Sequence, residues 1–424
     1  MAYGKPALGL RMSNKRCDNK QEHEPRPVRN RPVVVILTTV PYTLNTFFRG
    51  QLAYLRDSGF EIHTVASTGP EWPEIVERER VETHQIPMTR TRLGVGDVRA
   101  LIRLVRLFRN LRPDVVHTFT PKGGLLGLIA ASLSGVPVRS NTIFGFVFAS
   151  RRGAKRSLLR FFESLSCGLA TTVYAESESI AQLAVSERVC ALRKMKILPA
   201  WSLNSTREQL QAWSYREELR RSTRSRLNIP EGAFVFGYIG RLVPEKGTRE
   251  LIDSFYSLDG DADVHLLLVG PQEVEHPLPE ITRQKIRQHA RIHKVGFQPK
   301  ISPFLAAMDV LVHPSYREGL PSAPLESSAM GVPVITTDVP GCRDAVKHGY
   351  TGLLVPPANA QALVEAMRLL RVDEPLRARL GIQARSCVKN TMDVEKLWEQ
   401  LAADYRAPLG GTQTAKSQLI SSNT

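Results

Sequence analysis

The sequence predicts an α/β protein of two domains, each built around a parallel β-sheet, and three observations support this fold class. The length of 424 residues exceeds what a single ordinary hydrophobic core accommodates. Short apolar runs typical of buried parallel strands alternate with helical patterns along most of the chain. This alternation stops around residues 196–205 and starts again near Phe234. We therefore expect one domain over residues 31–200 and another over residues 201–390.

The first domain begins with the apolar run at 33–37, which predicts a buried parallel strand. Five more strands are expected on the same grounds, at 61–66, 84–88, 114–120, 138–144 and 171–175. The helical patterns between them include 46–58, 124–133 and 157–165. Such an alternation folds into a parallel sheet with helices on both faces, so ligands are expected at the carboxyl ends of the strands.

The second domain repeats this pattern, with strands predicted at 234–240, 264–270, 310–314 and 332–338. An amphipathic stretch follows it, and we expect a terminal helix over residues 391–406. Residues 1–30 are polar and basic and are expected to be disordered. Residues 407–424 are expected to form a flexible tail.

The net charge of +16 predicts an anionic partner, because such a field attracts nucleic acid, anionic lipid or an anionic substrate. Arg99, Arg103, Arg106 and Arg109 are spaced to lie on one helical stripe, and a second basic block follows at 151–160. The stripe is either an ordinary solvated face or a surface for anionic lipid, which attracts each basic residue by about 1 kcal/mol. Nucleic acid is not expected, because the sequence shows no aromatic platform or recognition module for it.

The five cysteines are scattered and odd in number, which argues against both a disulfide framework and a zinc site. No apolar run reaches the length of a membrane span, and residues 1–30 lack the apolar core of a signal peptide. We therefore expect a cytoplasmic protein held peripherally at the inner face of the cell membrane.

The stretch most informative about function contains two glutamates, Glu318 and Glu326, around a predicted turn from the strand at 309–313 to a helix at 325–330. Their spacing places them on either side of a helix N-terminus, whose backbone amides and positive dipole end form a site for phosphate. A diphosphate there would have one carboxylate on each side to accept hydrogen bonds from hydroxyl groups, which describes a nucleotide sugar. The residues expected to border that diphosphate are Gly319, Leu320, Pro321 and Ser322.

Two cations are predicted at the start of the second domain. After the strand at 234–240 the chain turns tightly at Gly240 and presents Arg241 and Lys246 before a helix. Both would lie at the carboxyl end of a strand, where they can neutralise a diphosphate. With two cations and a helix N-terminus available, no metal ion is needed to offset the charge of a leaving group. We therefore expect neither a metal nor another cofactor.

The glutamate-containing run resembles the E-x7-E motif of the family 4 retaining glycosyltransferases, which have the GT-B fold, two Rossmann-like parallel-sheet domains facing each other across a cleft. The resemblance extends over residues 315–344 and 352–356. In these segments the sequence is similar to the branch of the family that builds capsular polysaccharide and exopolysaccharide. The resemblance implies that Glu318 contacts the donor sugar and that Glu326 binds the ribose hydroxyls. It also implies that Arg241 and Lys246 grip the diphosphate, and that the terminal helix crosses back onto the first domain.

On the acceptor side, the candidates are His117 and Lys122, at the end of the strand predicted at 114–120 and in the glycine-bearing turn after it. A histidine in such a place is alternatively a structural hydrogen-bonding residue. Phe144 departs from the family pattern, because many relatives carry a histidine there that faces the transferred sugar. Phenylalanine cannot transfer a proton, so either that histidine is dispensable or the chain has lost activity.

Together with this resemblance, which implies retention, these observations predict a retaining hexosyltransferase that moves a sugar from a nucleotide diphosphate sugar, expected to be a UDP-sugar. The expected acceptor is a lipid-linked saccharide of cell-surface polysaccharide biosynthesis, at an anionic membrane surface. One alternative is a non-catalytic sugar-nucleotide-binding or scaffold protein of a polysaccharide assembly complex, which Phe144 favours. Another is a GT-B sugar-nucleotide epimerase, which would need an acid and a base at the sugar carbon.

Overall fold

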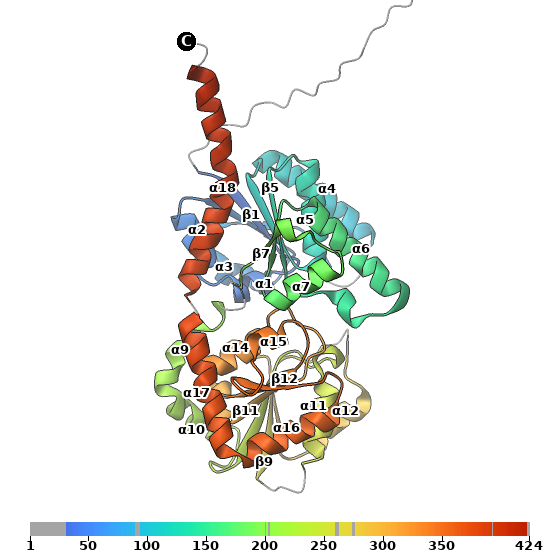
Figure 1. The fold of residues 1–424 in the computed structure, drawn as a ribbon, viewed down its shortest axis with the longest axis vertical. Coiled ribbons are helices and arrows are strands. Elements are labelled where there is room, and N and C mark those ends of the chain that lie inside the picture. The colour runs from blue at the N-terminus through green and yellow to red at the C-terminus, as the bar shows by residue number, and fades with distance from the viewer. Residues whose placement is uncertain are drawn as a thin grey trace, which may run out of the picture. The chain divides into compact units, whose positions relative to one another are not determined.

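The computed structural model describes residues 31–89, 94–199, 201, 204–258, 263–273, 276–391 and 393–421. The predicted disordered segment 1–30 lies outside these residues. From Arg31 onward the chain forms one compact unit, which contains two parallel sheets with helices on both faces (Figure 1). The predicted fold class is therefore confirmed.

The first sheet has seven strands in the order β3-β2-β1-β4-β5-β6-β7, and all of its pairings are parallel. The strands are β1 (Val33–Leu37), β2 (Glu61–Ala66), β3 (Glu82–Gln85), β4 (Val115–Phe119), β5 (Val138–Ile143), β6 (Thr172–Ala175) and β7 (Met195–Ile197). The strand order reverses between β1 and β4, which makes their carboxyl ends a preferred place for ligands.

Successive residues of β1 face opposite layers of helices, as the two-residue period of a strand requires. Val34 and Ile36 pack with helices α1 (Pro41–Phe47), α2 (Gln51–Asp57) and α3 (Trp72–Glu79). Val35 and Leu37 pack with α4 (Val95–Leu111) and α5 (Pro121–Leu133). Helices α6 (Gly153–Leu169) and α7 (Glu178–Ser186) complete the second layer beside β5 and β6.

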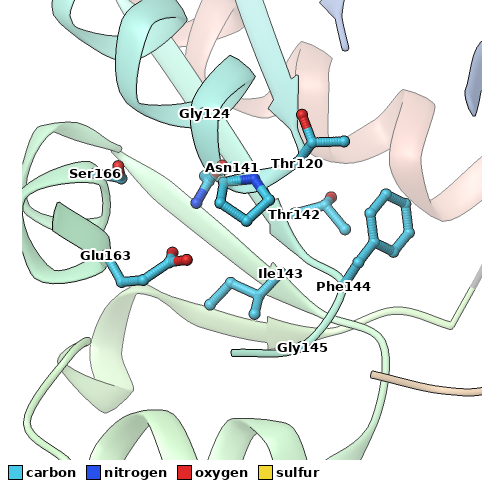
Figure 2. A pocket seen from close by; sticks show the side chains of 10 residues that line it. Thr120, Gly124, Asn141, Thr142, Ile143, Phe144, Gly145, Glu163 and Ser166 are labelled. Carbon is cyan, nitrogen blue, oxygen red and sulfur yellow. The ribbon is translucent and has the colours of Figure 1, made fainter. Parts of the chain in front are cut away.

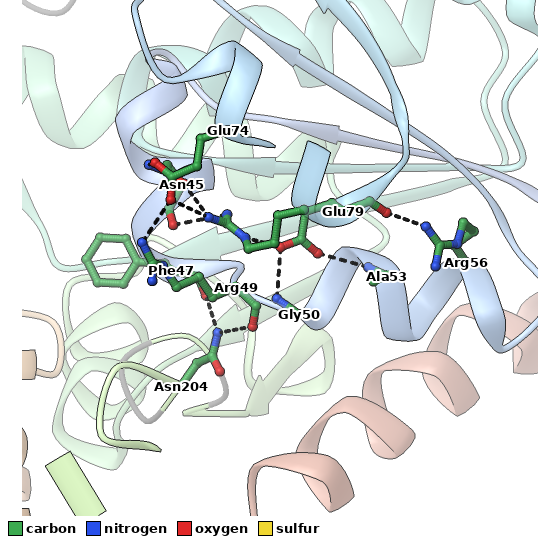
Figure 3. Close-up of polar contacts among 10 residues, drawn as sticks. Asn45, Phe47, Arg49, Gly50, Ala53, Arg56, Glu74, Glu79 and Asn204 are labelled. Carbon is green, nitrogen blue, oxygen red and sulfur yellow. Dashed lines mark hydrogen bonds and ion pairs between the residues drawn. The ribbon is translucent and has the colours of Figure 1, made fainter. Parts of the chain in front are cut away.

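One helix was predicted at 46–58, but the structure has two, α1 and α2, separated at Phe48–Gly50. Gly50 has a φ of 74°, which continues no right-handed helix. The buried carboxylate of Glu79 accepts hydrogen bonds from the backbone amides of Gly50 and Ala53, at 2.9 and 3.0 Å, and so caps the start of α2 (Figure 3). Asn204 donates hydrogen bonds to the carbonyl oxygens of Phe47 and Arg49, which ties the segment between the sheets to this break (Figure 3).

The second sheet has six parallel strands in the order β10-β9-β8-β11-β12-β13. They are β8 (Phe234–Ile239), β9 (Val264–Val269), β10 (Ile292–Gly296), β11 (Val310–His313), β12 (Val334–Thr337) and β13 (Gly352–Val355). One face packs against α9 (Arg207–Ala212), α10 (Arg216–Arg226), α13 (Ser302–Ala307) and α14 (Ser322–Ala329). The other packs against α11 (Thr248–Tyr256), α12 (Glu280–Gln288), α16 (Ala360–Val372) and α17 (Glu374–Thr391). The short helix α15 (Cys342–Ala345) follows β12.

The sequence located the central strands better than the strands at the sheet edges. β7, β10 and β13 were not predicted, and the strand expected at 84–88 lies instead at Glu82–Gln85 as β3. All four are terminal strands of their sheets. Three of them carry polar residues where a central strand has a continuous apolar run, so hydrophobic periodicity is weak there.

The terminal helix α18 (Val394–Ser421) packs onto the first domain through Trp398, Leu401 and Tyr405, which join the core that contains α2 and Phe60. The expected boundary at residue 406, with a flexible tail beyond it, lies inside this helix, which continues past Pro408. Proline is a poor residue for a helix interior, so local propensity does not account for the continuation.

Across the described ranges, no helix combines the length and the apolar character that crossing a membrane requires.

Candidate donor site

The second sheet reverses its strand order between β8 and β11, and most of the predicted donor-site residues follow these two strands. Gly240, Arg241 and Lys246 come after β8, and the segment from Ser315 to Ser322 comes after β11. Gly247, beside Lys246, has a φ of 69°, and a Cβ atom there would lie 2.0 Å from the carbonyl oxygen of Pro314. The two segments are therefore packed backbone to backbone, and glycine is required at their contact.

Glu318 lies at the centre of a buried ionic cluster. Its Oε1 is 2.5 Å from Nζ of Lys246 and 2.7 Å from Nε2 of His313, and its side chain is 11% exposed. Burial alone would raise the pKa of Glu318, but the charge of Lys246 and the hydrogen bond from His313 hold that pKa well below its usual range. Glu318 is therefore a carboxylate at neutral pH.

Sequence analysis did not identify His313, although it is the last residue of β11. Its side chain is 4% exposed, and its Nδ1 has no hydrogen-bond partner in the described part of the chain. The available signal was its position at the carboxyl end of a predicted strand, five residues before Glu318. The apolar run around it predicted a strand and gave no sign of a polar role.

Arg241 pairs with two carboxylates, Glu273 at 2.5 Å and Glu245 at 3.3 Å. Burial favours the neutral form of Arg241, but the hydrogen bond and charge of Glu273, together with Glu245, outweigh it and raise its pKa. Glu245 also lies 3.5 Å from Arg317, the residue before Glu318. Glu245 thus links Arg241 to Arg317, whereas the other predicted cation, Lys246, pairs with Glu318.

The predicted helix N-terminus is present at α14, which begins at Ser322 with Pro321 as the residue before it. The N-cap residue, Pro321, makes no side-chain hydrogen bond to this helix start. Pro321 has no amide hydrogen and cannot donate to a phosphate, whereas Ser322 and Ala323, the first two residues of the helix, each carry one. Leu320 and Pro321 are buried, whereas Ser322 is partly exposed.

Glu326 lies in α14 and is 8% exposed. Burial raises its pKa to about 7, and the charge of Glu208 acts in the same direction, whereas a hydrogen bond from Ser205 opposes them. The pKa values of the two glutamates of the motif are therefore shifted in opposite directions, because Glu318 has a cationic partner and Glu326 has none among its named neighbours.

The segment at Phe144 and Gly145, which follows β5 of the first sheet, lies directly against Glu318 and Gly319. A Cβ atom on Gly319 would lie 2.6 Å from the carbonyl oxygen of Phe144, and one on Gly145 would lie 2.8 Å from that of Glu318. Ser177 adds a hydrogen bond of 2.9 Å from its hydroxyl to the carbonyl oxygen of Gly319. The backbone of Glu318 and Gly319 is thus held against the first domain by these contacts.

The ring of Phe144 is near three aromatic side chains, with ring centroids 5.7 Å from Phe47, 5.8 Å from Phe119 and 6.3 Å from Trp201. It points away from a small pocket bordered by its own backbone (Figure 2). The side chain at the position of the family histidine therefore serves the hydrophobic core.

His117 is fully buried, and both of its ring nitrogens are engaged. Its Nδ1 is 2.5 Å from the hydroxyl of Tyr405, and its Nε2 is 2.7 Å from that of Thr142. Burial lowers its pKa well below the usual value. This is the environment of a structural residue. His117 has no exposed ring atom that could contact an acceptor.

Lys122 is also buried, with Nζ 3.0 Å from Oδ1 of Asp97 and 3.0 Å from the hydroxyl of Thr89. Asp97 lies in α4, so this ion pair joins α5 to α4 inside the first domain. The structure therefore places both predicted acceptor-side residues in internal contacts.

The predicted arginine stripe lies on the solvent side of α4, where Arg99, Arg103, Arg106 and Arg109 are all exposed. The structure shows no ion pair between any of the four and another described side chain. The nearby helix α6 exposes Leu158, Phe161 and Leu165, together with part of the second basic block. Helices α4, α5 and α6 lie side by side (Figure 1). Both α4 and α6 expose basic and apolar side chains.

The described residues contain no group of three or more His, Cys, Asp or Glu side chains that could hold a metal ion. Independence of metal remains a prediction.

Two families match the chain, one over each domain. Residues 43–201 match the family described as "Glycosyl transferase 4-like domain", and residues 220–386 match "Glycosyl transferases group 1".

Two similar proteins are glycosyltransferases by name. The capsular polysaccharide biosynthesis glycosyltransferase CapM of Staphylococcus aureus is 31% identical over 358 residues, which cover 84% of this chain and 92% of CapM. The UDP-Gal:α-D-GlcNAc-diphosphoundecaprenol α-1,3-galactosyltransferase of Escherichia coli is 26% identical over 69% of this chain and 74% of its own length.

Among solved structures, Anabaena HepE in complex with UDP and glucose is similar in fold. The TM-score is 0.70 at 18% identity, over 88% of this chain and 99% of HepE.

Proposed function

Because the chain belongs to the family 4 glycosyltransferases of the capsule and polysaccharide branch, with the GT-B fold, we propose that it transfers a sugar from a UDP-sugar to a lipid-linked saccharide with retention of anomeric configuration. The observation that carries this proposal is the Glu318 cluster at the reversal point of the second sheet. It combines a carboxylate, two cations and a helix start within one set of packed segments. The carboxylate suits the hydroxyl groups of a sugar, and the two cations suit a diphosphate. The helix start suits phosphate oxygens.

In the proposed complex, the diphosphate lies between Arg241, Lys246 and the start of α14. These groups stabilise the charge that develops on the leaving nucleotide as the bond to the sugar breaks. Glu318 accepts hydrogen bonds from the donor sugar and fixes its orientation, and Glu326 accepts them from the ribose hydroxyls.

Neither Phe144 nor His117 of the first domain is placed as a nucleophile beside Glu318. Phe144 supplies only its backbone there, and His117 is buried in other contacts. We therefore favour attack by the acceptor hydroxyl on the same face from which the nucleotide departs, with the leaving phosphate accepting the proton. This route gives retention without a covalent enzyme intermediate.

The UDP-sugar donor and the lipid-linked acceptor are supported by the Escherichia coli relative, whose name specifies UDP-Gal and a diphosphoundecaprenol-linked sugar. The exposed basic and apolar side chains of α4 and α6 support an association with anionic membrane, where such an acceptor would be found.

The test is a panel of UDP-, GDP- and ADP-sugars, assayed for nucleotide release with and without a bacterial lipid-linked saccharide extract. We expect acceptor-dependent release from one UDP-sugar and a product whose anomeric proton shows the configuration of the donor by NMR. Release that depends on acceptor with another nucleotide would overturn the choice of UDP. An inverted product would overturn the same-face route.

A further inference from the structure

The carboxylate of Glu318 has two hydrogen-bond partners, and both reach the same oxygen atom. Nζ of Lys246 lies 2.5 Å and Nε2 of His313 lies 2.7 Å from Oε1. Within the part of the chain that the structure describes, no hydrogen bond involves Oε2. The protein therefore holds Glu318 by Oε1, and Oε2 is the oxygen left for a hydroxyl group of a ligand.

The ionised carboxylate determines which ring nitrogen of His313 carries a hydrogen. Burial would raise the pKa of Glu318, but the charge of Lys246 and the hydrogen bond from His313 hold that pKa well below its usual range. An ionised carboxylate only accepts hydrogen bonds, so Nε2 of His313 carries a hydrogen and donates it to Oε1. The other ring nitrogen, Nδ1, is buried without a partner among the described residues.

A role in stability does not account for this arrangement. The side chain of His313 is 4% exposed, and a buried polar atom without a partner is costly. The buried His117 of the first domain shows a fully satisfied ring, because both of its nitrogens have hydroxyl partners. In His313 only the nitrogen that faces Glu318 is satisfied, which indicates that this contact is the function of the ring.

The backbone that joins the two side chains is fixed by strand β12. The buried hydroxyl of Thr336 donates to the carbonyl oxygen of His313 at 2.8 Å. The buried hydroxyl of Thr337 donates to the carbonyl oxygen of Ser315, which lies between His313 and Glu318 in the chain. The ring and the carboxylate thus belong to one short segment that is anchored at two points, which favours a constant geometry between them.

Lys246 alone would hold the carboxylate less precisely. Its ammonium group is a point charge on a flexible chain, and the proposed function also places it at the diphosphate. The ring of His313 has few rotatable bonds and is enclosed, so Nε2 fixes both the position and the direction of its hydrogen bond. His313 is therefore the partner that keeps Glu318 in place when Lys246 turns toward a diphosphate.

We propose that His313 is a positioning residue of the donor site, whose Nε2–H holds Oε1 of Glu318 so that Oε2 meets a hydroxyl group of the donor sugar. The assignment rests on the proposed function, because it takes Glu318 as the residue that contacts that sugar. His313 does not touch the ligand itself. Its loss should affect the binding and transfer of the sugar and leave the binding of the nucleotide intact.

The experiment compares substitutions of His313 that differ in where they place an N–H group. In His313→Gln the amide nitrogen is as many bonds from Cα as Nε2 is, so the hydrogen bond to Glu318 is kept. In His313→Asn the amide nitrogen corresponds to Nδ1 and is too close to the backbone, and His313→Leu has no nitrogen. His265→Leu is the matched control, because His265 is also buried in the second sheet but lies near the amino end of β9, 2.9 Å from His293.

Calorimetry with UDP-, GDP- and ADP-sugars and with the free nucleotides, without acceptor, reads binding that needs no turnover. For the nucleotide sugar that wild type binds most tightly, His313→Leu and His313→Asn should raise Kd by roughly tenfold and leave Kd for the free nucleotide within about twofold. His313→Gln should stay within about threefold of wild type for both ligands. His265→Leu should match wild type at temperatures where it is folded.

A kinetic measurement adds the effect on transfer. With a donor that wild type turns over, kcat should fall by roughly a hundredfold in His313→Leu and His313→Asn, and by no more than about fivefold in His313→Gln. Binding stoichiometry from the calorimetry gives the fraction of folded sites, so that a loss of folded protein is not counted as a loss of kcat.

Three results would overturn the positioning role of His313. One is wild-type affinity for the nucleotide sugar and wild-type kcat in His313→Leu, or in His313→Asn if the leucine variant does not fold. Another is an equal loss in His313→Gln, since the shape of the ring and not its N–H would then matter. The third is a parallel loss of affinity for the free nucleotide. Wild type that binds a nucleotide sugar through His313 but transfers the sugar to no acceptor overturns the proposed function instead.

Discussion

At the scale of single residues, the charge state of each glutamate of the motif follows from its neighbours. Glu318 has Lys246 at 2.5 Å and is ionised, whereas Glu326 is buried without a cation and has its pKa raised to about 7. Both glutamates could be identified from the sequence as candidate site residues, because their spacing places them on either side of a helix N-terminus. Their charge states could not, because these depend on which side chains the fold places beside them.

The raised pKa of Glu326 predicts a measurable dependence of stability on pH. Its folded-state pKa of about 7 exceeds the ordinary value of 4.5, so the protonated form is favoured in the folded chain. The stabilisation is complete below pH 4.5 and is lost as pH rises through 7. Above pH 8, Glu326→Gln should therefore be more stable than wild type, by on the order of 3 kcal/mol in the free energy of unfolding.

Denaturant unfolding of both proteins at pH 5.5 and pH 8.5, without nucleotide, checks this expectation. The comparison must be between the two proteins, because Glu163 also has a pKa raised to about 7 and adds its own pH dependence to both. A difference in stability that does not grow with pH would show that Glu326 is ionised in the folded chain.

At the scale of elements, the central strands are predictable and the contacts that position side chains are not. Runs such as Val264–Val269 are apolar throughout, because both faces of the sheet are covered. The break between α1 and α2 depends on Glu79, which is distant in sequence, so a helical pattern alone gave one helix. The burial of Glu163 on α6 could not be predicted for a related reason, since an acidic residue in an amphipathic helix gives no sign that it faces inward.

The contact between α18 and β4 gives a prediction about His117. Tyr405→Phe removes the hydroxyl that lies 2.5 Å from Nδ1 of His117 and leaves a buried ring nitrogen without its partner. We expect a loss of about 1–3 kcal/mol in the free energy of unfolding, with kcat/KM unchanged at temperatures where the variant is folded. Tyr350→Phe, at a 46% exposed tyrosine, is the matched control. Unchanged stability together with lost activity would mean that His117 acts in the acceptor site after all.

The exposed arginines of α4 give a second prediction at this scale. Replacing Arg99, Arg103, Arg106 and Arg109 together by glutamine should weaken binding to phosphatidylglycerol vesicles by roughly a hundredfold to a thousandfold at low salt. Sedimentation with vesicles, compared with neutral phosphatidylcholine, measures it. Since all four side chains are exposed, the fold should be unaffected.

A control for total charge uses four exposed basic residues of the second domain. These are Arg287, Lys347, Arg368 and Arg379. If replacing them by glutamine weakens vesicle binding equally, net charge rather than the α4 surface is responsible, and the proposed association of α4 with the membrane is wrong.

At the scale of the whole molecule, the site depends on segments that are far apart in the sequence. The Glu318 and Gly319 backbone touches Phe144 and Gly145, and it accepts a hydrogen bond from Ser177. The two-sheet fold could be predicted from the alternation of strands and helices, and the candidate donor residues were proposed from the motif. The closeness of these segments could not, because nothing in the local pattern of either one specifies the other.

The central claim is that Glu318 orients the donor sugar while Lys246 and Arg241 hold the diphosphate. The most direct measurement compares wild type with Glu318→Ala for sugar transfer and, by calorimetry, for UDP affinity. We predict that transfer falls by at least about a hundredfold, while UDP binds as tightly or more tightly, because the substitution releases Lys246 from its carboxylate partner. A parallel loss of transfer and of UDP affinity in a folded variant would contradict the account.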